Sequence, residues 1–238
     1  MKFFRRLFAS RRIPPVSNEV SPRVAAIIGA LQARSEPCVR LVSGGDGRSR
    51  LGGTPDMDVA WPRYEGRPLS FVAQLDLSEI RSAGGPEWLP ADGRLLFFYE
   101  LERGSWGSEA ADLGSAVVIH QAGVLTAALE PDDLPDDATF PAYPVTSTQA
   151  VSTPTEERLG IDWRSLNPAS ARALEQALEN LSPARPAHQI GGYPSPVQSD
   201  MMEVECQDIG KPLGQRGDVG DWRLPLQLGT DDDARMVG

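Results

Sequence analysis

Histidine and cysteine are scarce in this chain of 238 residues, which contains only two of each. His120, His188, Cys38 and Cys206 lie far apart, with no CxxC pair and no histidine pair at ligand spacing. Zinc needs three or four nitrogen, sulfur or oxygen ligands, and a catalytic triad needs a histidine beside a nucleophile. Because the sequence also lacks a GxSxG elbow and a P-loop, it predicts no metal, no cofactor and no recognisable catalytic centre.

Long apolar runs are missing as well. No stretch reaches the roughly 20 apolar residues that span a bilayer. Arginines interrupt the apolar residues at the N-terminus, so the sequence offers no convincing secretory signal. We therefore expect a cytoplasmic protein, and the apolar content of 40% is typical of a soluble globular chain with a sizeable core.

Positive charge is scarce outside the N-terminus. The chain has 23 basic and 33 acidic residues, and five of the basic residues precede the first acid, Glu19, so the remainder carries 18 − 33 = −15. Such a body repels phosphate backbones, which predicts no nucleic-acid binding and favours a basic protein as a partner. If residues 2–12 form a helix, its apolar and basic side chains lie on opposite faces, which suits weak contact with a membrane surface. The alternative is that these residues form a solvated tail.

Two helices and several short strands predict an α+β fold with mainly antiparallel sheets. Ser21 and Asn167 are suitable N-caps, each is followed by proline at the first helical position, and apolar residues then recur at helical spacing. Seven runs have strand composition: 38–43, 69–77, 93–101, 115–121, 124–130, 201–207 and 222–229. The fourth and fifth runs flank Ala122-Gly123, which predicts a hairpin.

A short sequence motif occurs twice in the chain. RLGGTP at 50–55 and QIGGYP at 189–194 share an aliphatic residue, two glycines, a variable residue and a proline, and each precedes an apolar run with a Gln-Leu pair. We interpret Gly52, Gly53, Pro55, Gly191, Gly192 and Pro194 as structural turn residues, because glycine tolerates positive φ and proline ends strand pairing. We expect Gln74 and Gln227, if they face inward, to bond to the neighbouring glycine-rich turn.

The repeated motif predicts two degenerate, similar halves packed about a pseudo-twofold axis. We expect residues 1–18 to form a basic arm and linker, and residues 19–238 to form a single domain. Half one covers about 19–130 and half two about 160–238. The second half has no counterpart of the strand GRLLFFYEL at 93–101, so it is expected to lack its last strand.

The two motif regions resemble the YwqG-like family, a bacterial domain of unknown function. The first region is LGGTP followed by WP and GRPLSFVAQLDL, continued by LPADGRLLFF, and the second is HQIGGYP followed by QSD, continued by WRLPLQLGTDDD. The resemblance implies a single compact α+β domain and no established reaction, cofactor or catalytic residue. Some members lie near toxin–immunity loci, which implies an interaction role by association alone.

Polar residues flanking the second Gly-Gly turn are the candidate ligand-binding residues: His188, Gln189, Tyr193, Gln198 and Asp200. Two hypotheses remain. In the first, the chain is a non-catalytic binding protein whose acidic body engages a partner. In the second, it is an enzyme or a small-ligand binder with a site in the cleft between the halves, and His188 or Asp200 is a general base. A structural His188 would donate to a backbone carbonyl of the turn, and the aspartates at 231–233 would be solvated.

Overall fold

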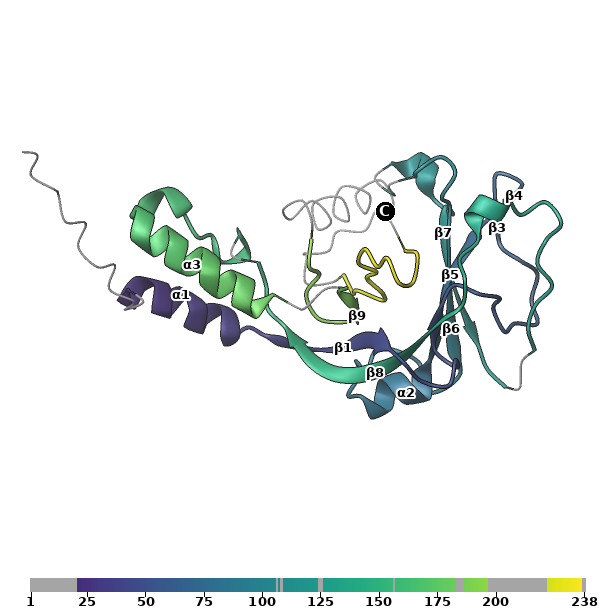
Figure 1. Ribbon diagram of the computed structural model, residues 1–238, viewed down its shortest axis with the longest axis horizontal. Helices are drawn as coiled ribbons and strands as arrows, with labels where there is room; N and C mark the ends of the chain where they lie inside the picture. The colour runs from purple at the N-terminus through teal and green to yellow at the C-terminus, as the bar shows by residue number, and fades with distance from the viewer. Residues whose placement is uncertain are drawn as a thin grey trace, which may run out of the picture.

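The computed structural model describes residues 21–236 except for 106, 108, 124–125, 156, 183–185 and 197–221. The basic arm at 1–18, the run at 201–207 with Cys206, and the candidates Gln198 and Asp200 therefore lie outside the described residues. The fold is α+β, as the sequence predicts, with a mainly antiparallel, curled sheet and few helices (Figure 1).

One large sheet forms the body of the protein. Its strands follow the order β7-β6-β5-β2-β8-β1-β9, and every neighbouring pair is antiparallel. The strands are β1 (Glu36–Ser43), β2 (Arg50–Leu51), β5 (Ser70–Asp76), β6 (Arg94–Tyr99), β7 (Ala116–Gln121), β8 (Tyr143–Ser152) and β9 (His188–Ile190). A separate small hairpin consists of β3 (Arg63–Tyr64) and β4 (Arg67–Pro68).

The central strand β8 is the longest strand that the sequence analysis missed, and the short strands β2, β3, β4 and β9 were missed as well. It pairs with β1 along eight residues and with β2 at its start, so it connects the two sides of the sheet. Its sequence, YPVTSTQAVS, mixes polar and β-branched residues, and only Val145 and Ser152 in it are buried. A strand with two partly exposed faces lacks the regular apolar alternation on which sequence prediction depends.

The predicted hairpin at Ala122-Gly123 is wrong. Ala127, in the second expected strand, forms an antiparallel bridge with Asp56 instead of pairing with β7, and the Ala128 N–H donates to the Pro55 carbonyl at 2.8 Å. The chain after β7 therefore returns to the first Gly-Gly turn. Pairing across a long sequence separation replaced the local pairing that the short turn suggested.

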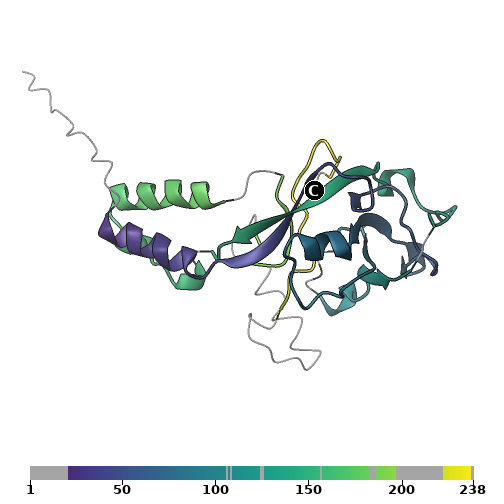
Figure 2. The same ribbon diagram turned by 90° about the horizontal axis from the view of Figure 1, so that it is seen from below.

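The helices begin where their capping residues predict. In α1 (Pro22–Gln32) the Ser21 hydroxyl accepts from the Val24 N–H at 3.3 Å, and in α3 (Pro168–Leu181) the Asn167 side chain accepts from the Ser170 N–H at 2.8 Å. The two helices lie side by side, away from the body of the sheet (Figure 1, Figure 2). Six-residue α2 (Leu77–Ser82) directly follows β5. Single 3-10 turns are η1 (Ala110–Asp112), η2 (Asp136–Ala138), η3 (Glu157–Leu159) and η4 (Trp163–Ser165).

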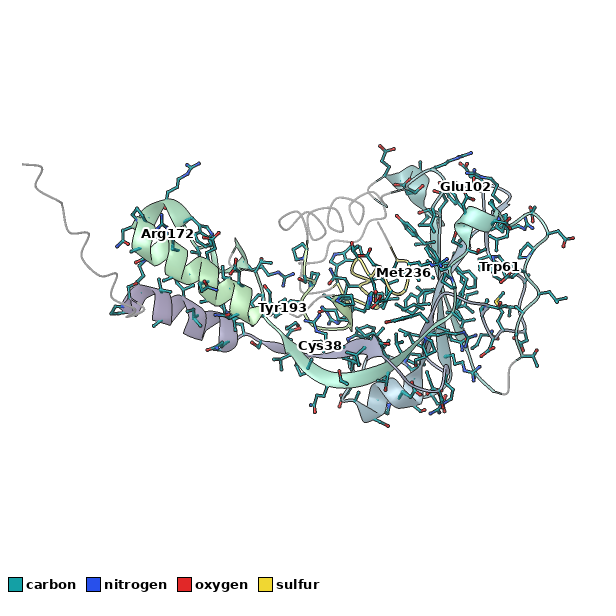
Figure 3. The ribbon with its side chains drawn as sticks, in the orientation of Figure 1. Cys38, Trp61, Glu102, Arg172, Tyr193 and Met236 are labelled. Carbon is teal, nitrogen blue, oxygen red and sulfur yellow. The ribbon has the colours of Figure 1, made fainter. Side chains whose placement is uncertain are left out.

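The main core lies on one face of the curled sheet and includes the C-terminal residues. Ala234 and Met236 are buried in the same apolar cluster as Leu41, Phe97 and Ile190, which come from strands at both ends of the sheet. Met236 lies between β9 and the β5–β7 part of the sheet in Figure 3. A smaller cluster covers the other face of β5 and β6, where Phe71 and Phe98 pack with ring centroids 5.3 Å apart.

Candidate functional site

Both Gly-Gly pairs have left-handed backbones. The φ angles are 58° and 74° for Gly52 and Gly53, and 68° and 66° for Gly191 and Gly192. A Cβ at Gly52 would lie 2.5 Å from the Pro141 carbonyl oxygen, and one at Gly192 would lie 2.1 Å from the Ser152 hydroxyl. Both the backbone conformation and the close packing therefore require glycine at these two positions.

Each turn is bound by the glutamine of a following apolar run. The Gln74 side-chain oxygen accepts from the Asp56 N–H at 2.8 Å, and the Gln227 oxygen accepts from the Ser195 N–H at 2.9 Å. Asp56 and Ser195 are both the fourth residue after the first glycine of their turn. The backbone pairing also matches, because Arg50 is the strand partner of Gln74 and Gln189 is the bridge partner of Gln227. The prediction that both glutamines bond to their turns is confirmed.

A second pair of similar hydrogen-bonded contacts lies next to the two turns, at an aspartate that follows each glutamine. The Asp76 carboxylate accepts from the N–H groups two and three residues later, and Asp231 does the same. Ser49, just before Arg50, accepts from the Asp76 N–H at 2.9 Å, and His188, just before Gln189, bonds to the Asp231 carboxylate at 3.0 Å. The residue just before each motif thus contacts the aspartate that follows the glutamine, although Asp76 is two residues after Gln74 and Asp231 is four residues after Gln227.

Charged side chains fill the surroundings of the first turn. Asp56 forms ion pairs with Arg94 at 2.7 Å and with Arg50 at 3.3 Å, and it also accepts from the Gln74 amide at 2.9 Å. Burial raises the pKa of the Asp56 carboxyl, but the hydrogen bonds from Gln74 and Arg50 outweigh it, so the pKa lies below its usual value. The polar groups around this turn therefore satisfy one another.

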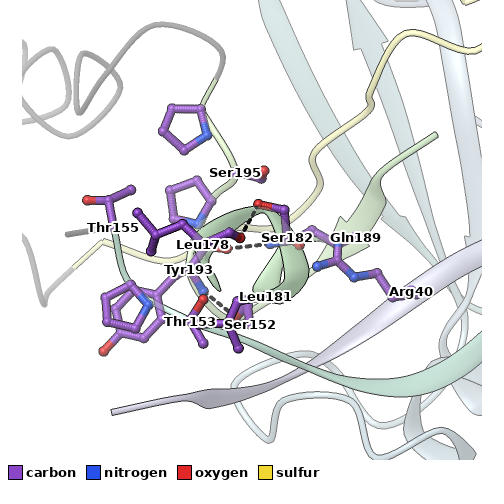
Figure 4. Close-up of a pocket in the computed structure, with 13 residues that line it drawn as sticks. Arg40, Ser152, Thr153, Thr155, Leu178, Leu181, Ser182, Gln189, Tyr193 and Ser195 are labelled. Carbon is purple, nitrogen blue, oxygen red and sulfur yellow. Dashed lines mark hydrogen bonds between the residues drawn. The ribbon is translucent and has the colours of Figure 1, made fainter. Parts of the chain in front are cut away.

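The second turn instead borders a cavity of about 350 Å³. Tyr193 and Gln189 contribute to its wall from the turn and β9, Arg40 from β1, Ser152 from β8 and Leu178 from α3. In Figure 4, Arg40 and Gln189 lie on one side of this space and Tyr193 on another. The volume is at the lower end of the range of about 300–1,000 Å³ that small-molecule sites occupy.

Two polar atoms at this cavity lack partners. Gln189 is fully buried, and its amide nitrogen donates to the Tyr193 carbonyl at 2.6 Å and the Gly191 carbonyl at 3.3 Å, whereas its side-chain oxygen has no hydrogen bond. One guanidinium nitrogen of Arg40, Nη1, is likewise buried and without a hydrogen bond. Burying unsatisfied polar atoms costs about 1–3 kcal/mol each, so such atoms in a native structure indicate a missing partner.

Arg40 lies beside a neutral thiol. Burial lowers the pKa of its guanidinium, although arginine remains charged in proteins. Burial also raises the pKa of the neighbouring Cys38 thiol, and this effect exceeds the opposing influence of Arg40 and Ser152. Cys38 therefore stays protonated at neutral pH and does not neutralise Arg40. Among the described residues, no carboxylate lies within ion-pair distance of Arg40.

The sequence candidates do not gather at one site. His188 is directly opposite Leu41 and faces the core, whereas Gln189 is directly opposite Arg40 and faces the cavity, because successive strand residues point to opposite sides. Tyr193 also lines the cavity. Sequence reasoning missed Arg40, although a charged residue within the apolar run CVRLVS was a usable signal.

His188 has a different partner from the expected backbone carbonyl. Its Nε2 lies 3.0 Å from the Asp231 carboxylate, and its Nδ1 accepts from the Gly229 N–H at 3.2 Å. This pattern places the proton of a neutral ring on Nε2 and leaves no free nitrogen to act as a base. The expectation that Asp231 is solvated is wrong, because Asp231 and His188 are only 6% and 2% exposed.

His120 is also bonded to the protein, since its Nε2 lies 2.8 Å from the Asp92 carbonyl. In the part of the chain that the structure describes, no three His, Cys, Asp or Glu side chains are grouped to hold a metal ion. None of the helices in that part is long and apolar enough to span a membrane.

A family comparison matches most of the chain. The model of a family described as a domain of unknown function, DUF1963, matches residues 49–237 and thus includes both Gly-Gly turns and both following glutamines. Strand β1, which carries Arg40, lies outside the matched range. No curated protein matches the chain significantly. Because the match covers well over half of its length, the chain belongs to the DUF1963 family of domains of unknown function.

Proposed function

We propose that this chain is a non-catalytic binding protein and that the cavity beside the second Gly-Gly turn is its ligand site. The observation that carries the proposal is the side-chain oxygen of Gln189, which is buried at the cavity without a hydrogen bond. Since this oxygen has almost no exposed surface, the Gln189 amide must shift toward the cavity for a bound molecule to donate to it, and that contact would remove the cost of leaving the oxygen unsatisfied. The wall adds a charged group, Arg40, and some apolar surface from Leu178 and Leu181.

Binding is better supported than catalysis at this turn. Both ring nitrogens of His188 are occupied within the protein, and its side chain faces away from the cavity. Cys38, the thiol in the described part of the chain, has a raised pKa and is a poor nucleophile in this state. An enzyme with a site at His188 and Asp200, the alternative, would need His188 to leave Asp231.

We also infer that the protein is a single YwqG-like domain of two similar halves related by a pseudo-twofold axis. The support is the matching pairs of contacts at the two turns: Gln74 with Asp56 and Gln227 with Ser195. The cavity beside the second turn is then a feature that this half acquired. A basic protein partner, cytoplasmic location, and weak membrane contact through residues 2–12 stay predictions from charge and composition.

Ligand-observed NMR with a mixture of small polar fragments tests the site. Thr153 lines the cavity, so Thr153→Trp should fill it, whereas Val151→Trp adds the same ring at a position that is 66% exposed. Fragments should bind the wild type and Val151→Trp but not Thr153→Trp. If no fragment binds, or if a folded Thr153→Trp variant retains all binding, the cavity is not a ligand site.

A further inference from the structure

We infer that the cavity ligand is a small carboxylate that carries a hydrogen-bond donor on a neighbouring atom, as in an amino acid, a 2-hydroxy acid or a peptide C-terminus. This inference rests on the proposed function and specifies its ligand class. It depends on two adjacent side chains with opposite hydrogen-bonding needs, Arg40 and Gln189, and on the engagement of the Tyr193 and Ser195 N–H groups within the protein.

Arg40 supplies a cation that needs an anion. Its guanidinium is partly buried, its Nη1 has no hydrogen bond, and its neighbour Cys38 is a neutral thiol. Removing a charge from water is costly unless the charge is paired and hydrogen-bonded. The planar guanidinium fits a carboxylate through two parallel N–H donors, which makes a carboxylate a suitable partner.

Gln189 defines the second group of the ligand. Its amide nitrogen donates to two carbonyl oxygens, those of Gly191 and Tyr193, so the amide cannot be rotated without placing oxygen against oxygen. The orphan atom is therefore the oxygen, which can only accept. A ligand at this position must offer an N–H or O–H group.

The register of the strands places these two side chains next to each other. Arg40 on β1 and Gln189 on β9 are direct partners in the antiparallel pair. Directly opposed side chains project from the same face, with Cβ atoms about 4.5–5.5 Å apart. A single small molecule can therefore contact both side chains, and a carboxylate with a donor on a neighbouring atom is the smallest ligand that offers both groups.

A phosphate group fits this turn less well. Phosphate sites on glycine-rich loops depend on several free backbone N–H groups that converge on the anion. Here the Tyr193 N–H donates to the Ser152 hydroxyl at 2.8 Å, and the Ser195 N–H donates to Gln227. With these donors already used, Arg40 provides the anion contact, which suits a single negative charge.

Calorimetric titration with five related probes tests the inference. 3-Phenyllactate has the carboxylate and the donor, 3-phenylpropionate lacks the donor, and 3-phenyllactamide lacks the negative charge. L-Phenylalanine and glycyl-phenylalanine present the same pair of groups as a free amino acid and as a peptide end. We expect 3-phenyllactate to bind at least about tenfold more tightly than the propionate or the amide, because each loses one contact to a buried group. If L-phenylalanine binds more tightly than glycyl-phenylalanine, the ligand is a free amino acid; the reverse order indicates a peptide C-terminus.

Variants assign the contact to Arg40. Arg40→Met should remove the preference for 3-phenyllactate over its amide, and Arg40→Lys should retain part of it. The control Arg172→Met removes an exposed charge on α3, outside the cavity (Figure 3), and should change nothing. Equal affinity of the wild type for acid and amide, with both abolished by Thr153→Trp, would refute the carboxylate inference but keep the ligand site. If none of the five probes binds, the inference is wrong, and if the fragment mixture also fails, so is the proposed function.

Discussion

The two Gly-Gly turns share a backbone design but differ in how their polar groups are satisfied. At the first turn, Arg50 pairs with Asp56, and Gln74 and Arg94 complete the set. At the second, the corresponding positions hold Gln189 and Ser195, and neither carries a charge. The charged groups at the first turn thus pair with one another. Within the described residues at the second turn, an acceptor on Gln189 and a cation on Arg40 are left unpaired in the wall of a cavity. A shared scaffold can therefore be purely structural in one place and open to a ligand in another.

The largest expected effect comes from adding a side chain inside the first turn. Gly52→Ala combines a left-handed backbone with a Cβ 2.5 Å from a backbone oxygen, so it should destabilise by about 3–5 kcal/mol. A Cβ at Gly191 would have a Pro86 side-chain atom as its nearest neighbour, at 3.1 Å, so Gly191→Ala should cost about 1–2 kcal/mol. Urea unfolding measures both. Gly47→Ala is the control for backbone strain alone, because its φ is 86° and nothing lies within 4 Å. Equal losses for all three variants would mean that packing against the turns is unimportant.

The next effect separates the two arginines. Arg50→Met should destabilise by about 2–3 kcal/mol, since it removes an ion pair with the part-buried Asp56 and leaves that carboxylate with fewer partners. Arg40→Met removes a cation that has no carboxylate partner among the described residues, so unliganded protein should lose at most about 0.5 kcal/mol or gain stability. Thermal unfolding of both variants without ligand provides the comparison. A large loss for Arg40→Met would show that the protein itself satisfies this side chain.

The sequence predicted the elements whose signals are local. The caps at Ser21 and Asn167 and the glutamine contacts of both turns follow from residue chemistry within a few positions or from a repeated motif. Strand β8 was missed because its two faces are both partly exposed, so its pattern is not periodic. Gln189 and Tyr193, two of the candidates named from the sequence, line the cavity, whereas Arg40 joins them only through the β1–β9 pairing, which no local signal specifies.

His188 shows the same limit in another way. Its place beside Gln189 in the sequence suggested a shared site, but adjacent strand residues face opposite sides. The C-terminal Asp231 then becomes its partner, 43 residues away. A run of three aspartates near the end of a chain looks solvated by composition, and only the folded structure reveals that one of them is buried.

The smallest effect concerns pH and the buried pair beneath the second turn. Burial raises the pKa of the Asp231 carboxyl, but the hydrogen bonds from His188 and two backbone N–H groups lower it by a larger amount. The pKa in the folded protein therefore lies below the pKa in the unfolded chain. The carboxylate therefore contributes stability that is fully present above the unfolded pKa of about 3.9. This contribution is lost as the pH falls through the lower, folded pKa.

Asp231→Asn should consequently cost about 1–2 kcal/mol at pH 7, because the amide replaces a charged acceptor of three hydrogen bonds. The difference from the wild type should begin to shrink below about pH 4, where the unfolded wild-type carboxyl takes up a proton, and it should vanish only below the lower, folded pKa. Asp232→Asn, at an exposed neighbour, is the matched control and should show neither effect. Denaturant unfolding of the three proteins between pH 3 and 7 measures the difference. A gap that stays constant with pH would mean that the Asp231 carboxylate is not stabilised by its charge, and the contact beneath the second turn would then resemble the uncharged Ser49 contact beneath the first.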